Sequence, residues 1–108
     1  GGGIPPEKMA YVVRWSPRAL EDVEAIAEYI QKDSPFYAKA VVAKIVAASR
    51  RLVDFPLSGR IVPETGDSAV REFFVFSYRV IYRIEGTIVT IAAVVHGKRL
   101  LKGEDEDI

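Results

Sequence analysis

Residues 78–96 read YRVIYRIEGTIVTIAAVVH, in which two runs of β-branched and aromatic residues flank a glycine. Side chains in such runs alternate between the two faces of a sheet, so the stretch predicts a β-hairpin. We place a two-residue turn at Glu85-Gly86, because glycine accepts the positive φ that such turns require. In this register Arg79 faces Ala92 across the hairpin.

The two sides of this hairpin differ in character. One is apolar throughout and is expected to face the core: Tyr78, Val80, Tyr82, Ile84, Val89, Ile91, Ala93 and Val95. The other mixes aliphatic residues with arginines and the single histidine: Arg79, Ile81, Arg83, Ile88, Thr90, Ala92, Val94 and His96. Exposed aliphatic patches usually bind a partner, although arginine stems over apolar neighbours on an ordinary solvent face explain the same pattern.

A strand and two helices are predicted upstream. Residues 11–15 form a short β-branched and aromatic run typical of a strand. Ser16-Pro17 and Ser34-Pro35 each predict a helix start, since serine caps free amides and proline fits the first turn. Two apolar stripes follow at helical spacing: Leu20, Val23, Ile26, Ala27 and Ile30, then Ala38, Val42, Ile45, Ser49 and Leu52. The short connection makes the two helices antiparallel.

The region between the helices and the hairpin contains a loop and one more strand. Residues 54–69 are rich in turn formers, and loops of this length are usually functional or mobile. Residues 70–75 return to strand periodicity, but a Phe76-Ser77 turn of two or four residues leaves their facing open. The predicted order is therefore strand, helical hairpin, loop and three-stranded meander, an α+β chain.

Composition limits the possible functions. The 108 residues suit one domain, which we place at residues 9–102 after a leader at 1–8 that resembles an expression scar. Without cysteine there is no disulfide, thiol nucleophile or cysteine-bound zinc, and one histidine leaves no credible metal site. No apolar run approaches the ~18 residues of a membrane span, and no glycine motif that cradles a phosphate or a dinucleotide is present.

Charge is spread unevenly along the chain. Fifteen basic and fifteen acidic residues cancel, but residues 44–102 hold ten bases and five acids, and residues 103–108 hold four acids. A basic body predicts an anionic partner, either a phosphate backbone or an acidic protein, while a solvated charged surface is the simpler explanation. We expect the acidic tail, residues 103–108, to be disordered.

Several local motifs occur together in a recognisable order. They are Trp15-Ser16-Pro17-Arg18-Ala19 with Asp22 and Ile26, Phe55-Pro56 with Gly59-Arg60, Pro63-Glu64, Arg71-Glu72, Tyr78-Arg79-Val80-Ile81-Tyr82-Arg83, and His96-Gly97-Lys98-Arg99. In order and spacing they resemble the RelE/ParE superfamily of bacterial toxins from type II toxin–antitoxin modules. The resemblance runs from about Met9 to Leu101.

This resemblance implies a fold and a set of partners. The fold is a two-layer β-α-α-β-β-β domain, with the helical hairpin on one face of a mainly antiparallel four-stranded sheet and the first strand at the edge beside the last. The partner is a ParD- or RelB-like antitoxin in a cytoplasmic hetero-oligomer, without cofactor, metal or membrane. One branch of the superfamily cleaves messenger RNA on the ribosome, and the other poisons DNA gyrase in modules that stabilise plasmids.

The ribonuclease branch demands chemistry that this sequence supplies only in part. Arg79 and Arg99 match arginines that RelE-like enzymes use, but Arg71 and Phe73 stand where those enzymes carry lysines. Arginine is a poor base and phenylalanine carries no proton. His96 could supply an acid or base, or it could simply hydrogen-bond the turn that follows it. The supporting late tyrosine of that branch has no counterpart.

We therefore expect a ParE-like toxin that binds gyrase without catalysing a reaction, with a RelE-like mRNA endoribonuclease as the alternative. If the chain is a ribonuclease, its catalytic candidates are Arg79, Arg99, His96 and Arg71. The candidate contacts with the target or the antitoxin are Arg79, Ile81, Arg83, Val94, His96, Lys98 and Arg99. The groove between the helical hairpin and the sheet is a further expected antitoxin contact.

Overall fold

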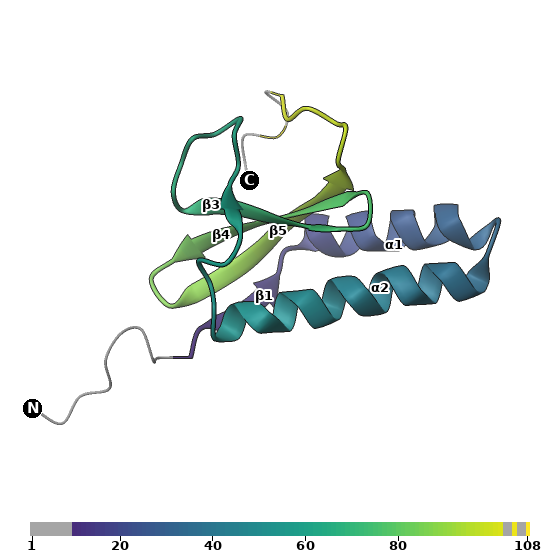
Figure 1. Ribbon diagram of the computed structural model, residues 1–108, viewed down its shortest axis with the longest axis horizontal. Helices are drawn as coiled ribbons and strands as arrows, with labels where there is room; N and C mark the ends of the chain where they lie inside the picture. Colours follow the sequence, from purple (N-terminus) through teal and green to yellow (C-terminus); the bar gives the residue numbers. More distant parts are fainter. Residues whose placement is uncertain (1–9, 103–104, 106–107) are drawn as a thin grey trace, which may run out of the picture.

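Two helices lie across one face of a five-stranded sheet in the computed structural model, which describes residues 10–102, 105 and 108 (Figure 1). The elements are β1 (Val12–Trp15), α1 (Pro17–Gln31), α2 (Pro35–Arg50), the 3-10 turn η2 (Arg51–Val53), β2 (Arg60–Ile61), β3 (Val70–Val75), β4 (Tyr78–Glu85) and β5 (Ile88–His96). The strand order is β1-β5-β4-β3-β2, with β1 parallel to β5 and the other pairs antiparallel. The predicted α+β architecture is confirmed, and β2 is a short fifth strand inside the expected loop.

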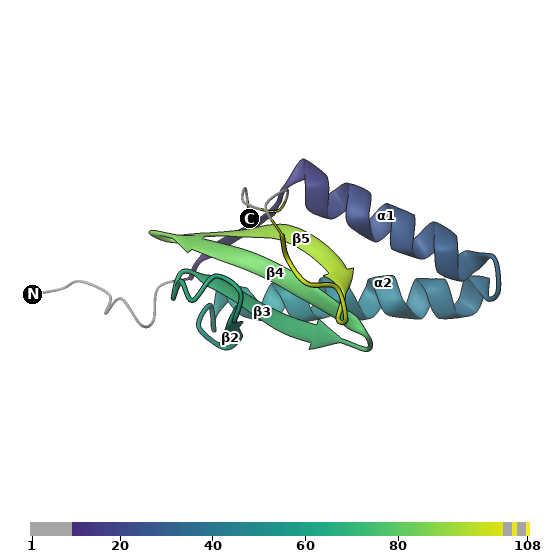
Figure 2. The same cartoon turned by 90° about the horizontal axis from the view of Figure 1, so that it is seen from above.

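Serine caps start both helices as predicted. The hydroxyl of Ser16 accepts a hydrogen bond from the amide of Ala19 at 3.0 Å, and Ser34 accepts from Tyr37 at 3.1 Å. Both helices pack on what we call the helix face of the sheet (Figure 2), where α2 contributes Val41 and Ile45. The predicted stripes are wrong at Leu20, which is 55% exposed, and at Val42, whose place in the core is taken by Val41.

The predicted register of the last hairpin is wrong. The two-residue turn is Gly86-Thr87, since Glu85 pairs with Ile88, and Gly86 supplies the positive φ. The pairing then shifts between Ile81 and Tyr82, a β-bulge in which β5 carries one extra residue. Arg79 therefore faces Val95 rather than Ala92.

The bulge exchanges the faces of the last residues of β5. Val94 packs in the helix-face core, whereas Ala93 and Val95 lie on the opposite side, which we call the open face. His96 pairs with Tyr78 and contacts its ring. The expectation that it shares a face with Arg79 and Arg83 is therefore wrong.

Side chains from α1 and its cap hold the bulge. The hydroxyl of Ser16 donates to the carbonyl oxygen of Ala92 at 3.0 Å, and the amide of Val94 donates to Asp22 Oδ2 at 2.9 Å. Ala92 is the extra residue of the bulge, and a buried backbone group without a partner is costly. The bulge therefore depends on residues more than seventy positions upstream.

The Phe76-Ser77 turn has two residues, because Val75 pairs with Tyr78. This places Phe73 against the helix-face core and Glu72 on the open face with Arg79. Phe76 adopts a positive φ of 52° at the turn, a conformation that costs free energy for a residue with a side chain.

A second apolar cluster lies on the open face, so this face is not left bare. It contains Val62, Val70, Ile81, Ala93, Val95 and Ile108, flanked by Ala92 and Leu101. Asp105 and Ile108 are both buried, contrary to the expected disorder of the acidic tail at these two positions. The leader at 1–8 and the other residues of the tail lie outside the described residues. Among the described residues, neither helix is both long and apolar enough to cross a membrane.

Candidate functional site

Arg79 lies buried at the centre of an ionic cluster on the open face. Its Nε donates to Glu72 Oε1 at 2.6 Å, and its Nη1 and Nη2 donate to the two carboxylate oxygens of Glu64 at 2.7 and 2.8 Å. Nη1 also donates to the carbonyl oxygen of Arg99 at 3.0 Å. The Arg79 side chain is only 4% exposed. Every nitrogen of the guanidinium is thus engaged within the protein.

The two carboxylates are fixed as firmly as the arginine. Glu72 has a fully buried side chain, and its second oxygen accepts from Arg60 Nε at 2.7 Å. The hydrogen bond from Arg79 holds the pKa of Glu64 at about 2, against its ordinary 4.5, although burial acts in the opposite direction. The same pairing raises the pKa of Arg79. Glu64 and Arg79 therefore both stay ionised at neutral pH.

The loop that leads into β2 is tied to β4 through Tyr82 of the helix-face core. The hydroxyl of the buried Tyr82 donates to the carbonyl oxygen of Pro56 at 2.7 Å and accepts from the amide of Gly59 at 2.9 Å. A Cβ on Gly59 would lie 2.6 Å from the backbone oxygen of Glu72, so only glycine fits there. Arg71 donates to the carbonyl oxygens of Gly59 and Ser68 at 3.0 Å, which makes it a clamp on the same loop.

The end of β5 carries the exposed basic residues. His96 accepts a hydrogen bond at Nδ1 from the amide of Lys98 at 3.2 Å and contacts the Tyr78 ring edge-on, 5.9 Å between centroids. Lys98 and Arg99 are exposed, and the Arg99 guanidinium donates to Asp105 Oδ1 at 3.1 Å. The structure thus gives His96 the turn-bonding role that was the simpler of its two explanations.

Comparison with known proteins identifies the family to which this chain belongs. Residues 13–101 match the model of the ParE toxin of the type II toxin–antitoxin system parDE. The chain belongs to the ParE toxin family. It is 34% identical over 93 residues to Toxin RelE2 of Caulobacter vibrioides, covering 85% of this chain and all of that protein. It is also 46% identical over 48 residues to Y4kP of Sinorhizobium fredii, which bears a toxin name; that match covers 44% of this chain and half of the relative.

Solved structures share the fold. The chromosomal ParDE system of P. aeruginosa matches with a TM-score of 0.68 at 21% identity, over 82% of this chain and 98% of that chain. The toxin–antitoxin complex RelBE2 of Mycobacterium tuberculosis gives 0.54 at 27% identity, over 82% and 92%. A mutant of the E. coli toxin RelE in the free state, with two arginines replaced by alanine, gives 0.60 at 17% identity, over 83% and 86%. The similar proteins thus include both ParE-named and RelE-named toxins.

Within this ParE-family fold, the predicted site residues do not form one site. Arg79, Ile81 and Arg83 share the open face, but Ile81 is fully buried and Val94 lies in the helix-face core. His96 is directed away from Arg79. Arg83 reaches the tail, since its Nη2 donates to the carbonyl oxygen of Ile108 at 2.5 Å.

The residues that sequence reasoning missed are the acids that neutralise the arginines. Glu64 and Glu72 were noted only as parts of motifs, and Asp105 only as part of a charged tail. The single glutamate of strand 70–75, whose other residues apart from Arg71 are apolar, is a usable signal, because such a residue is rarely buried without a cation. Within residues 10–102, 105 and 108, no group of three or more His, Asp or Glu is placed to hold a metal ion.

Proposed function

We propose that this ParE-family toxin arrests growth by binding DNA gyrase in the cytoplasm, and that a cognate ParD-like antitoxin neutralises it. The observation that carries the proposal is the state of Arg79. Glu64, Glu72 and a backbone carbonyl take four of the five N–H donors of Arg79, and the side chain is only 4% exposed, so it is poorly placed to bind a scissile phosphate. The residue that a RelE-like enzyme would need as a cation is here part of the framework.

The proton-transfer groups of an RNA-cleaving site are also poorly met around Arg79. Cleavage through the 2′-hydroxyl needs a base for that hydroxyl and an acid for the leaving oxygen. Glu64, with a pKa of about 2, is a weak base and is held by Arg79. His96 lies on the opposite face of the sheet from Arg79, and the Arg71 guanidinium is engaged with carbonyl oxygens of the loop. A binding role for this surface requires none of these groups to move a proton.

The antitoxin partner rests on the solved relatives. The P. aeruginosa match is a ParDE system and the M. tuberculosis match is a toxin–antitoxin complex, and both cover 82% of this chain. A basic body with an excess of five positive charges over residues 44–102 would suit an acidic partner segment.

Ribosome-dependent mRNA cleavage is the second candidate, because the relative RelE2 aligns over its whole length. The exposed Lys98 and Arg99 at the end of β5 are the side chains that such an activity would use to contact RNA.

Supercoiling of relaxed plasmid by purified gyrase separates the two candidates. The toxin should inhibit supercoiling and leave cleaved plasmid trapped on the enzyme, and stoichiometric antitoxin should reverse both effects. Ribosome-bound mRNA should stay intact in a parallel translation reaction. Undisturbed supercoiling together with cut mRNA would overturn the gyrase proposal in favour of the second candidate. Arg50→Gln should inhibit supercoiling as the unaltered chain does, since Arg50 is exposed in the last turn of α2 and is not among the candidate contacts.

A further inference from the structure

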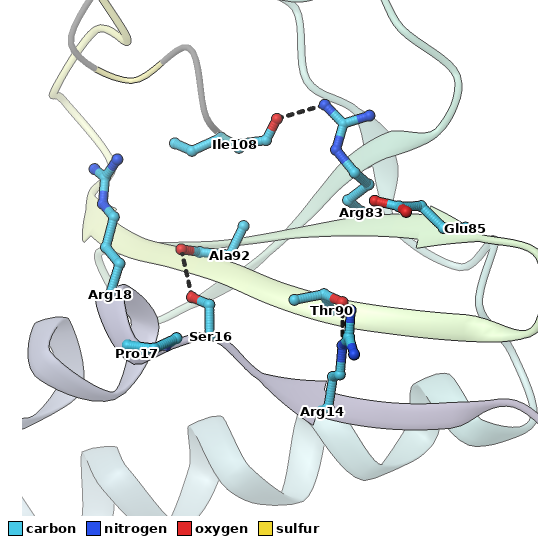
Figure 3. A pocket seen from close by; sticks show the side chains of 9 residues that line it. All are labelled: Arg14, Ser16, Pro17, Arg18, Arg83, Glu85, Thr90, Ala92 and Ile108. Carbon is cyan, nitrogen blue, oxygen red and sulfur yellow. Dashed lines mark hydrogen bonds between the residues drawn. The ribbon is translucent and has the colours of Figure 1, made fainter.

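Three arginines line a hollow on the open face beside the tail (Figure 3). Arg14 from β1, Arg18 from α1 and Arg83 from β4 surround a cavity of about 430 Å³, together with the single acid Glu85. Thr90 and Ala92 of β5 form its floor, and Ile108 stands at its rim. We call this hollow the arginine trough. Its excess of guanidinium groups favours an anionic ligand.

An acid of the chain's own tail already binds one of the arginines that line the trough. Asp105 Oδ1 accepts from Arg18 Nη2 at 2.7 Å and from Arg99 Nη2 at 3.1 Å, and its side chain is only 1% exposed. The amide of Lys102 donates to Asp105 Oδ2 at 3.0 Å. That bond, with help from Arg18, lowers the pKa of Asp105 against the effect of burial. Arg18, which lines the trough, thus already binds a carboxylate, with Arg99 as a second donor.

An aliphatic side chain of the tail occupies the neighbouring apolar patch. Ile108 is 4% exposed and packs in the cluster that contains Val62, Ile81 and Val95. Arg83 fixes its backbone through the carbonyl oxygen. An acid on the arginines followed by an aliphatic residue on the patch is therefore the ligand pattern that this face accepts.

The two described residues of the tail, Asp105 and Ile108, fill this surface only in part. The hollow at the trough lies on one side of Ile108, and a second one of about 460 Å³, lined by Glu64, Val70 and Asp105, also borders it. Among the described residues, the Arg14 side chain donates a hydrogen bond only to the hydroxyl of Thr90, at 3.0 Å. A ligand that reached Arg14 and filled both hollows would make contacts that Asp105 and Ile108 do not make.

We propose that the arginine trough and its aliphatic patch are a binding site for an acidic, aliphatic peptide segment of the antitoxin, and that the tail occupies this site in cis until the segment displaces it. The identity of the partner rests on the proposed function. The chemistry of the peptide does not rest on the proposed function, because the apolar patch beside the arginines suits an aliphatic side chain better than a nucleic-acid backbone.

Binding of a labelled peptide to the full chain tests the site directly. The probe is an end-blocked GEDEDI, the sequence of residues 103–108, with GQNQNI as its uncharged control. Asp105→Ala weakens the tail as competitor, so this variant should bind GEDEDI about tenfold more tightly than the unaltered chain. Adding Arg83→Gln or Arg18→Gln should reverse that gain, whereas adding Arg50→Gln should leave it. Thermal melting checks that each variant is folded.

Competition identifies the natural occupant. Antitoxin should displace GEDEDI from the Asp105→Ala variant, and it should bind that variant more tightly than the unaltered chain. Equal peptide binding by all variants, binding of GQNQNI as tightly as GEDEDI, or antitoxin binding without displacement would each overturn the inference. A single-stranded RNA that binds the trough when the peptide does not would overturn it too. If the antitoxin does not bind at all, the proposed function loses its partner, while the peptide titration still decides whether the trough is a site.

Discussion

The two faces of the same sheet are stabilised in different ways. The helix face packs aliphatic and aromatic side chains from α1, α2 and the strands, with Val41, Ile45 and Val80 fully buried. The open face combines a small aliphatic cluster with buried ion pairs and a covering of loop and tail. Buried charge adds little net stability over well-packed apolar residues but is costly to unpair. The helix face therefore supplies most of the stability, and the open face is specialised for polar contacts.

Removing one charge from the open face should have the largest effect. Glu72→Ala leaves the buried Arg79 without one of its two acids, and we expect a loss of about 3–5 kcal/mol in the free energy of unfolding. The double variant Glu72→Leu with Arg79→Met should lose less than Glu72→Ala alone, because the buried Arg79 charge is removed with its partner. Urea denaturation measures both. A Glu72→Ala chain as stable as the unaltered one would contradict this account of the open face.

Substitution of one buried isoleucine on each face compares how well the two faces tolerate a cavity. Ile45 and Ile81 are both fully buried. Ile45→Ala should cost about 3 kcal/mol, since the two layers around it are fixed, whereas Ile81→Ala should cost about 2 kcal/mol because the tail residue Ile108 can move into the space. Urea denaturation of both variants gives the difference. The reverse order would show that the open face is the more rigid one.

The β-bulge in β5 should become less stable when Asp22 is replaced. Asp22→Ala removes the acceptor for the Val94 amide and should cost about 1–2 kcal/mol. Asp22→Asn retains an oxygen acceptor and should cost less. Hydrogen exchange at Val94 is the sharper measurement, since exchange there should accelerate in the alanine variant and stay slow in the asparagine variant. Unchanged exchange in both variants would remove Asp22 from the explanation of the register.

Acid should lower the stability of the open face by less than the substitutions above. The pKa of Glu64 is lowered from 4.5 to about 2 in the folded state, so its contribution is complete above about pH 4.5 and is lost as the pH falls through 2. Glu64→Gln should flatten the decline in melting temperature between these pH values. Glu21→Gln on the exposed surface of α1 is the control and should not change the slope. Identical slopes for Glu64→Gln and the unaltered chain would contradict the pairing with Arg79.

The order of elements was predictable because it depends on local signals. Ser-Pro caps, helical stripes and strand alternation are contained in short windows, and the caps are satisfied locally in the structure. The register of the hairpin was not predictable in this way, because the bulge is held by Ser16 and Asp22, which lie more than seventy residues earlier in the chain. A single extra residue in β5 exchanged the faces of Val94 and Val95 and separated His96 from Arg79.

The candidate site was predictable in its cations and not in their partners. Arginines on the open side of β4 follow from alternation, and Arg79 and Arg83 lie there. Their state depends on Glu64, Glu72 and the tail, which reach them from separate loops and strands. Pairing between such distant acids and bases leaves no periodic trace in one sequence.

The parallel pairing of β1 with β5 has a consequence for synthesis of the chain. Val12 lies beside Ile88 and Trp15 beside Ile91, so the first strand has no neighbouring strand until the last one has been made. Contacts this distant along the chain form late in folding and slow it. A ribosome making this protein must therefore complete β5 before β1 can join the sheet.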